Sequence, residues 1–62
     1  MNNEDDFIPG SLIQIIYWDS PVLYTIISKW KINSHEYLYR ILSQRGKLYE
    51  TKFDSEYWSK IQ

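Results

Sequence analysis

Ser34, His35 and Glu36 are consecutive residues of the three types that form a hydrolytic triad. In such a triad a hydroxyl attacks, a histidine takes its proton and a carboxylate orients the histidine. Neighbouring residues of a strand point to opposite faces, so three in a row cannot converge on one substrate. We therefore expect them to form a polar hairpin tip. We expect no function from His35, because it is a lone exposed histidine in a turn.

The other residues do not form a pattern typical of a metal or cofactor site. Glu4, Asp5 and Asp6 offer carboxylates to a hard cation, yet consecutive acids outside a coordinating loop bind weakly. The chain has no cysteine and one histidine, which disfavours a zinc site. Its two glycines, Gly10 and Gly46, cannot form a glycine-rich phosphate loop. We expect no enzyme activity, no metal and no cofactor.

Basic residues near the predicted central hairpin could bind single-stranded nucleic acid, because aromatic rings lie close to them in the sequence. The candidates are Lys29, Lys31, Arg40, Arg45 and Lys47. The first three are predicted to share one face of the hairpin. Glu36 and Glu50 are predicted to lie opposite Lys31 and Arg40, and the formal net charge is −1. Nucleic-acid binding is therefore the alternative function rather than the leading one.

Aromatic residues around the turn at Asp19-Ser20-Pro21 form the candidate protein-binding site. Both faces of the preceding segment, 12–18, are mostly apolar, so some rings have no obvious place in a core. Tyr and Trp are favoured at the centres of protein interfaces. The candidates are Tyr17, Trp18, Asp19 and Tyr24. The competing interpretation is a second small core closed by Phe7, Trp58 or Ile61.

Composition indicates a single small domain over residues 7–62, preceded by a disordered acidic tail at residues 1–6. The chain lacks alanine and is rich in Ile and Tyr, so large side chains must supply its core. The start of the sequence lacks the features of a signal peptide, and no apolar run approaches the ~20 residues of a membrane span. We expect a soluble, cytoplasmic protein. The abundance of Ile, Asn, Lys, Tyr and Phe indicates an AT-rich genome.

Alternating apolar residues and turn signals predict an all-β fold. The expected strands are 12–18, 22–32, 35–43 and 47–53, followed by either one helical turn after Asp54 or a short closing strand. Placing Asn33-Ser34 at the hairpin turn sets Trp30 opposite Tyr37 and Ile26 opposite Ile41, which separates an apolar face from a charged one. A three-residue loop at 44–46 sets Arg40 opposite Glu50, Ile41 opposite Tyr49 and Leu42 opposite Leu48.

Two stretches carry a family resemblance. "FIPGSLIQI" resembles the opening of Src-homology-3-like small barrels of the Tudor and KOW type, in which a Pro-Gly turn leads into an apolar first strand. "YLYRILSQRGKLYE" is similar to their central hairpin. Short proteins of tailed phages share this outline. The resemblance implies a small barrel of four to five antiparallel strands with at most one short helical turn.

The function expected from the sequence is that of a non-enzymatic protein–protein interaction module. The resemblance and the amino-acid composition together imply a phage accessory, regulatory or virion protein, with a host or viral protein as its partner. Nucleic acid is the alternative ligand, and no membrane partner is expected. A homo-oligomer is compatible with the same features.

Overall fold

The computed structural model describes residues 4–17 and 20–61 and shows an all-β protein. A single 3-10 turn, η1 (Glu4–Asp6), precedes five antiparallel strands. These are β1 (Leu12–Tyr17), β2 (Ser20–Lys31), β3 (Tyr37–Ser43), β4 (Leu48–Lys52) and β5 (Trp58–Lys60). The predicted all-β fold of four to five antiparallel strands with at most one short helical turn is confirmed, and the number of strands is five.

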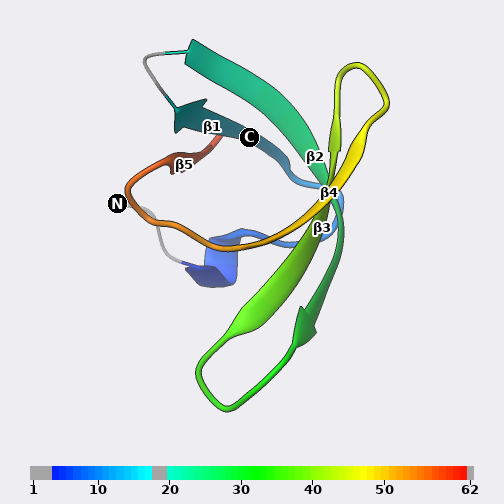
Figure 1. The fold of residues 1–62 in the computed structure, drawn as a ribbon. Coiled ribbons are helices and arrows are strands. Elements are labelled where there is room, and N and C mark those ends of the chain that lie inside the picture. Colours follow the sequence, from blue (N-terminus) through cyan, green and yellow to red (C-terminus); the bar gives the residue numbers. More distant parts are fainter. Residues whose placement is uncertain (1–3, 18–19, 62) are drawn as a thin grey trace.

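The strands form one curved sheet in the order β4-β3-β2-β1-β5 (Figure 1). The chain runs as a meander from β1 to β4, and β5 then returns to pair with β1. The sheet does not close into the predicted barrel, so β4 and β5 are its two edges. Figure 1 shows that η1 and the segment after β4 lie on the concave side. We call this side the inner face and the opposite side the outer face.

The core fills the inner face with a few large side chains. Trp58 is fully buried, and its ring meets those of Phe7, Tyr39 and Phe53 at centroid distances of 5.8, 5.1 and 5.5 Å. Aromatic pairs at such distances, with tilted or edge-on rings, are favourable beyond the area they bury. The remaining buried apolar residues among those described are Ile13, Ile15, Ile26 and Ile41.

Turn chemistry explains how the chain enters and leaves the strands. Gly10 and Gly46 both have positive φ, 92° and 84°, a conformation that glycine adopts without steric cost. Gly46 completes the β3–β4 turn, where its N–H donates to the carbonyl of Ser43. After β4, the Asp54 carbonyl accepts hydrogen bonds from the N–H groups of Tyr57 and Trp58. Of the two predicted alternatives for this segment, the short closing strand forms as β5, and a hydrogen-bonded turn that is not helical leads into it.

The predicted register holds over part of the sheet. Arg40 opposes Glu50 and Ile41 opposes Tyr49, as expected, and Leu42 opposes Leu48. In the β2–β3 hairpin the pairing of Ile26 with Ile41 is also confirmed.

Beyond Ile26 the predicted β2–β3 register is wrong. The register shifts between Ile26 and Ser28, which makes Ile27 the extra residue of a β-bulge. Trp30 then opposes Leu38 rather than Tyr37, and Tyr37 opposes Lys31. A one-residue shift moves every later side chain of β2 to the other face. Trp30 therefore lies on the outer face, 37% exposed, while Tyr37 packs against the core.

Two further expectations differ from the structure. Ser20 and Pro21 belong to β2 rather than to a turn, while Asp19 lies outside the described residues. Glu4–Asp6 form η1 rather than part of a disordered tail, and residues 1–3 lie outside the described residues.

Polar contacts hold η1 against the inner face. The Nζ of Lys29 donates to the carbonyls of Glu4 and Phe7 at 3.0 and 3.1 Å. The hydroxyl of Tyr39 donates to Oε2 of Glu4 at 3.1 Å. Burial, followed by the nearby Glu4 carboxylate, raises the pKa of the Tyr39 hydroxyl well above its ordinary value.

Replacing Trp58 with Ala should lower the free energy of unfolding by about 3–5 kcal/mol, because it leaves a large cavity in the core. Trp30→Ala is the matched control and should cost about 1 kcal/mol or less, since that side chain lies on the outer face. Denaturant unfolding measures both. Equal midpoints for the two variants would contradict this account of the core.

The raised pKa of Tyr39 should make the protein less stable at alkaline pH. Below the ordinary tyrosine pKa of 10.0 the stabilising contribution is complete, and it is lost as pH rises towards the higher folded-state pKa, because the unfolded chain releases the proton first. Tyr39→Phe should therefore show a shallower fall in unfolding free energy above about pH 10 than the wild type. The other tyrosines are common to both proteins, so parallel curves would contradict the prediction.

Candidate functional site

A cleft opens on the inner face where β2 extends beyond β3. The pairing of these strands ends at Tyr24 and Ser43, and residues 20–23 of β2 pair only with β1 among the described residues. The β1–β2 hairpin and the β3–β4 hairpin therefore separate at this end of the sheet (Figure 1). The hollow between them has a volume of about 460 Å³. Its lining comprises Pro21, Val22, Tyr24, Ser43, Gln44, Arg45 and Tyr49. We call it the tyrosine cleft.

Two tyrosines form the apolar part of the tyrosine cleft. The rings of Tyr24 and Tyr49 meet edge to face, with centroids 5.9 Å apart. Tyr24 is half-buried against the core, whereas Tyr49 is 40% exposed. A second hollow continues from these rings towards Ile15 and Ile41. The rings thus offer a partner both an apolar floor and an accessible aromatic edge.

Two cations lie at the rim of the tyrosine cleft. Arg45 lines it directly, and the Nζ of Lys47 lies 5.4 Å from the centroid of the Tyr49 ring. The ion pairs among the described residues join Arg40 to Glu50 and Lys52 to Glu36, so neither rim cation has an acidic partner there. The rim is therefore positively charged beside an aromatic surface.

The predicted protein-binding residues are only partly described. Tyr24 lines the tyrosine cleft, and Tyr17 ends β1 opposite Ser20. Trp18 and Asp19 lie outside the described residues. Tyr49 was missed, although the correctly predicted pairing of Ile41 with Tyr49 placed it on the core face. That row continues to Ile26, and Tyr24 lies two residues from Ile26 on the same face of β2, so the closeness of Tyr49 to Tyr24 could have been inferred.

The predicted basic face does not form. Lys29 lies on the inner face, where its Nζ is 4.6 Å from the centroid of Tyr37 and donates to main-chain carbonyls. Lys31 opposes Tyr37 on the same face. Arg40 lies on the outer face, paired with Glu50 at 2.7 Å. The bulge at Ile27 is the physical reason, because it exchanges the faces of all β2 residues that follow it.

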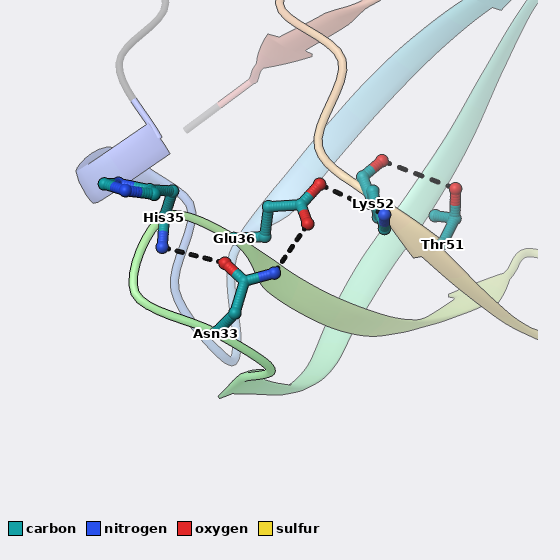
Figure 2. Close-up of polar contacts among 5 residues, drawn as sticks. All are labelled: Asn33, His35, Glu36, Thr51 and Lys52. Atoms are coloured by element: carbon teal, nitrogen blue, oxygen red, sulfur yellow. Dashed lines mark hydrogen bonds and ion pairs between the residues drawn. The ribbon is translucent and has the colours of Figure 1, made fainter.

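The β2–β3 hairpin tip contains the three residues of the types found in a hydrolytic triad, as expected: Ser34, His35 and Glu36. His35 uses its main-chain N–H to donate to Oδ1 of Asn33 at 2.8 Å, and Nδ2 of Asn33 donates to Glu36 at 2.7 Å. Lys52 reaches Glu36 from β4 at 3.0 Å (Figure 2). The hydrogen bond from Asn33, followed by that from Lys52, lowers the pKa of the Glu36 carboxyl. Figure 2 shows the His35 ring directed away from Glu36.

The outer face carries a second apolar region. Leu12, Thr25, Leu42 and Leu48 oppose one another in turn and form a row across four strands. Leu48 is 55% exposed at the edge of this row. Antiparallel sheets with one solvated face normally place polar residues there. The other three residues of the row are half-buried.

No known protein family, curated protein or solved structure matches this chain. None of the described helical segments is long and apolar enough to cross a membrane. The described residues also contain no group of three or more acidic or histidine side chains placed to hold a metal ion.

Lys29→Met should lower the free energy of unfolding by about 1–3 kcal/mol, because the carbonyls of Glu4 and Phe7 lose their donor. Lys31→Met is the control and should change it by about 0.5 kcal/mol or less, since that side chain is exposed. Denaturant unfolding measures both. If Lys29→Met were as stable as Lys31→Met, Lys29 would be available for a ligand rather than committed to the fold.

Proposed function

We propose that this protein is a non-enzymatic protein-interaction module whose partner binds in the tyrosine cleft. The observation that carries the proposal is the exposed Tyr49 ring, held against Tyr24 at the open end of the inner face. Aromatic residues in partly enclosed hollows supply much of the binding energy at protein interfaces. The cleft volume of about 460 Å³ is large enough for several side chains of a partner.

The electrostatics of the cleft favour a partner with acidic groups at its edge. Arg45 and Lys47 are close to Tyr49, and neither has an ion-pair partner among the described residues. Complementary charges at the rim of an interface mainly increase the association rate and select between partners. The apolar row on the outer face adds support for a role in protein association, because apolar surface of this kind is stabilised by burial.

A Src-homology-3-like family membership and a phage setting belong to the same proposal. Support comes from the two quoted stretches: a Pro-Gly turn with Gly10 at positive φ leads into β1, and Gly46 ends the turn of the β3–β4 hairpin. The abundance of residues with AT-rich codons supports a viral source. In that setting the partner is a host or viral protein, and the protein acts in the host cytoplasm or in the virion.

Nucleic-acid binding remains the alternative, and one observation favours it: Arg45 and Lys47 lie beside the accessible Tyr49 ring, on which a base could stack. Fewer cations are available to contact phosphates than the sequence predicted, because Lys29 donates to main-chain carbonyls and Arg40 is paired with Glu50. A salt titration separates the alternatives, since phosphate contacts give a steep dependence of log affinity on log salt concentration.

Tyr49→Ala should weaken partner binding roughly 30-fold, equivalent to about 2 kcal/mol. Peptides selected against the wild-type protein from a random displayed library serve as the probe, and their affinities are measured by titration. Tyr57→Ala is the matched control, because Tyr57 is 39% exposed and Tyr49 is 40% exposed, but Tyr57 does not line the cleft. Its affinity should stay within about 3-fold of the wild type.

Thermal melts of both variants must first show an intact fold. Equal losses of affinity in the two variants, or selected peptides that bind Tyr49→Ala as well as the wild type, would refute the tyrosine cleft as the binding site.

A further inference from the structure

The β4 edge of the sheet has a row of unpaired main-chain groups. The N–H of Ser43 donates to the carbonyl of Lys47, so the odd-numbered residues of β3 direct their main-chain groups towards β4. Their partners Tyr49 and Thr51 face back towards β3. Because main-chain direction alternates along a strand, the intervening residues direct N–H and C=O groups away from the sheet. These residues are Leu48, Glu50 and Lys52.

This edge is accessible to another strand. Leu48, Glu50 and Lys52 are all exposed, and β4 is the last strand on its side of the sheet. Among the described residues, their outward main-chain groups have one contact, a long hydrogen bond of 3.4 Å from the Thr51 hydroxyl to the Lys52 carbonyl. An open edge of this kind can accept a further antiparallel strand.

The charges on β4 indicate which strand it accepts. Glu50 and Lys52 carry opposite charges two residues apart, so both side chains lie on the outer face. Consider two copies of β4 that pair in antiparallel fashion, with the two-fold axis passing between their two Thr51 residues. In that register each Glu50 lies opposite Lys52 of the other copy. We propose that a second copy of this chain pairs its β4 with this β4 in that register, which forms a symmetric dimer with one continuous sheet.

Other symmetric registers are less favourable. An axis beside Glu50 places the two Glu50 carboxylates directly opposite each other, and like charges in that position are destabilising. An axis beside Tyr49 places Glu50 opposite Leu48 of the second copy and leaves Lys52 without an acidic partner across the interface. Only the axis beside Thr51 gives two reciprocal pairs of opposite charge.

The dimer is closed and small. The other edge strand, Trp58–Lys60, has three residues, so it offers little for continued strand addition into a fibre. Two short strands contribute about four main-chain hydrogen bonds, which places the interface at the low end of the size range. Dimerisation should therefore depend on protein concentration. The dimer does not rest on the proposed function, because it uses the outward main-chain groups and the outer-face side chains of β4, whereas the Tyr49 ring lines the cleft on the inner face.

Cysteine cross-linking tests the dimer and its register. The chain has no cysteine, so Thr51→Cys introduces a single thiol. In the proposed register the two Thr51 residues oppose each other without main-chain hydrogen bonds between them. Residues opposed in this way have Cα atoms about 4.5 Å apart, which is within the range that a disulfide spans. Under mild oxidation Thr51→Cys should form a disulfide-linked dimer at least about 10-fold faster than Ser55→Cys, an exposed control outside the edge. Equal rates, or fastest cross-linking by Tyr49→Cys, would overturn the proposal.

A charge swap provides a second test by sedimentation equilibrium on folded variants. Glu50→Lys and Lys52→Glu should each weaken the dimer, because each places like charges across the interface. The double variant Glu50→Lys/Lys52→Glu restores opposite charges and should recover most of the association. The intramolecular pairs that these changes disturb are exposed and contribute little to folding. Failure of the double variant to recover, or a wild type that stays monomeric at the highest concentration, would refute the proposal.

Discussion

The packing of other rings around the indole of Trp58 is the interaction on which this small sheet depends. It brings together β5, which contains the indole, the segment before β1 through Phe7, β3 through Tyr39 and the segment after β4 through Phe53. A chain of 62 residues without alanine or cysteine has few ways to offset its conformational entropy. Concentrating large rings at one point buries much apolar area with few residues. β5 pairs with β1 over only three residues. Its position therefore depends on the burial of the Trp58 side chain as well as on main-chain hydrogen bonds to β1.

The two ends of the inner face differ, and this difference creates the candidate site. At one end, η1 covers the core, and Lys29 and Tyr39 bond to it. At the other end, β2 continues past β3, and no described segment fills the space between the hairpins. The presence of Pro21 in β2 is consistent with this geometry. The N–H and C=O groups of Ile26 both bond to residues just before β1. Main-chain direction alternates along a strand, so the main chain of Pro21 points to the other side of β2, where no strand pairs with it. The N–H that proline lacks is therefore not needed for a hydrogen bond there.

The sequence predicted the strands well, because alternation and turn residues are local signals. It also predicted the β3–β4 register, since the short loop ending at Gly46 fixes it. The far half of the β2–β3 hairpin could not be predicted, because an uninterrupted period of two gives no sign that Ile27 is an extra residue. The inward position of Lys29 depends on carbonyls more than twenty residues away. The tyrosine cleft was found in part through Tyr24, but its other wall arises from tertiary contacts of Tyr49.

The pairing of Phe7 with Trp58 also constrains how the chain reaches this structure. These rings come from opposite ends of the sequence and pack 5.8 Å apart, so the core gains its main stabilisation only after a long loop has closed. The meander hairpins are local, but each buries little without the rings that complete the core. Folds dominated by such distant contacts cross a high entropic barrier and fold slowly for their size. The same connectivity couples both terminal segments to one cooperative unit, so loosening either one should open the whole domain rather than fray an end.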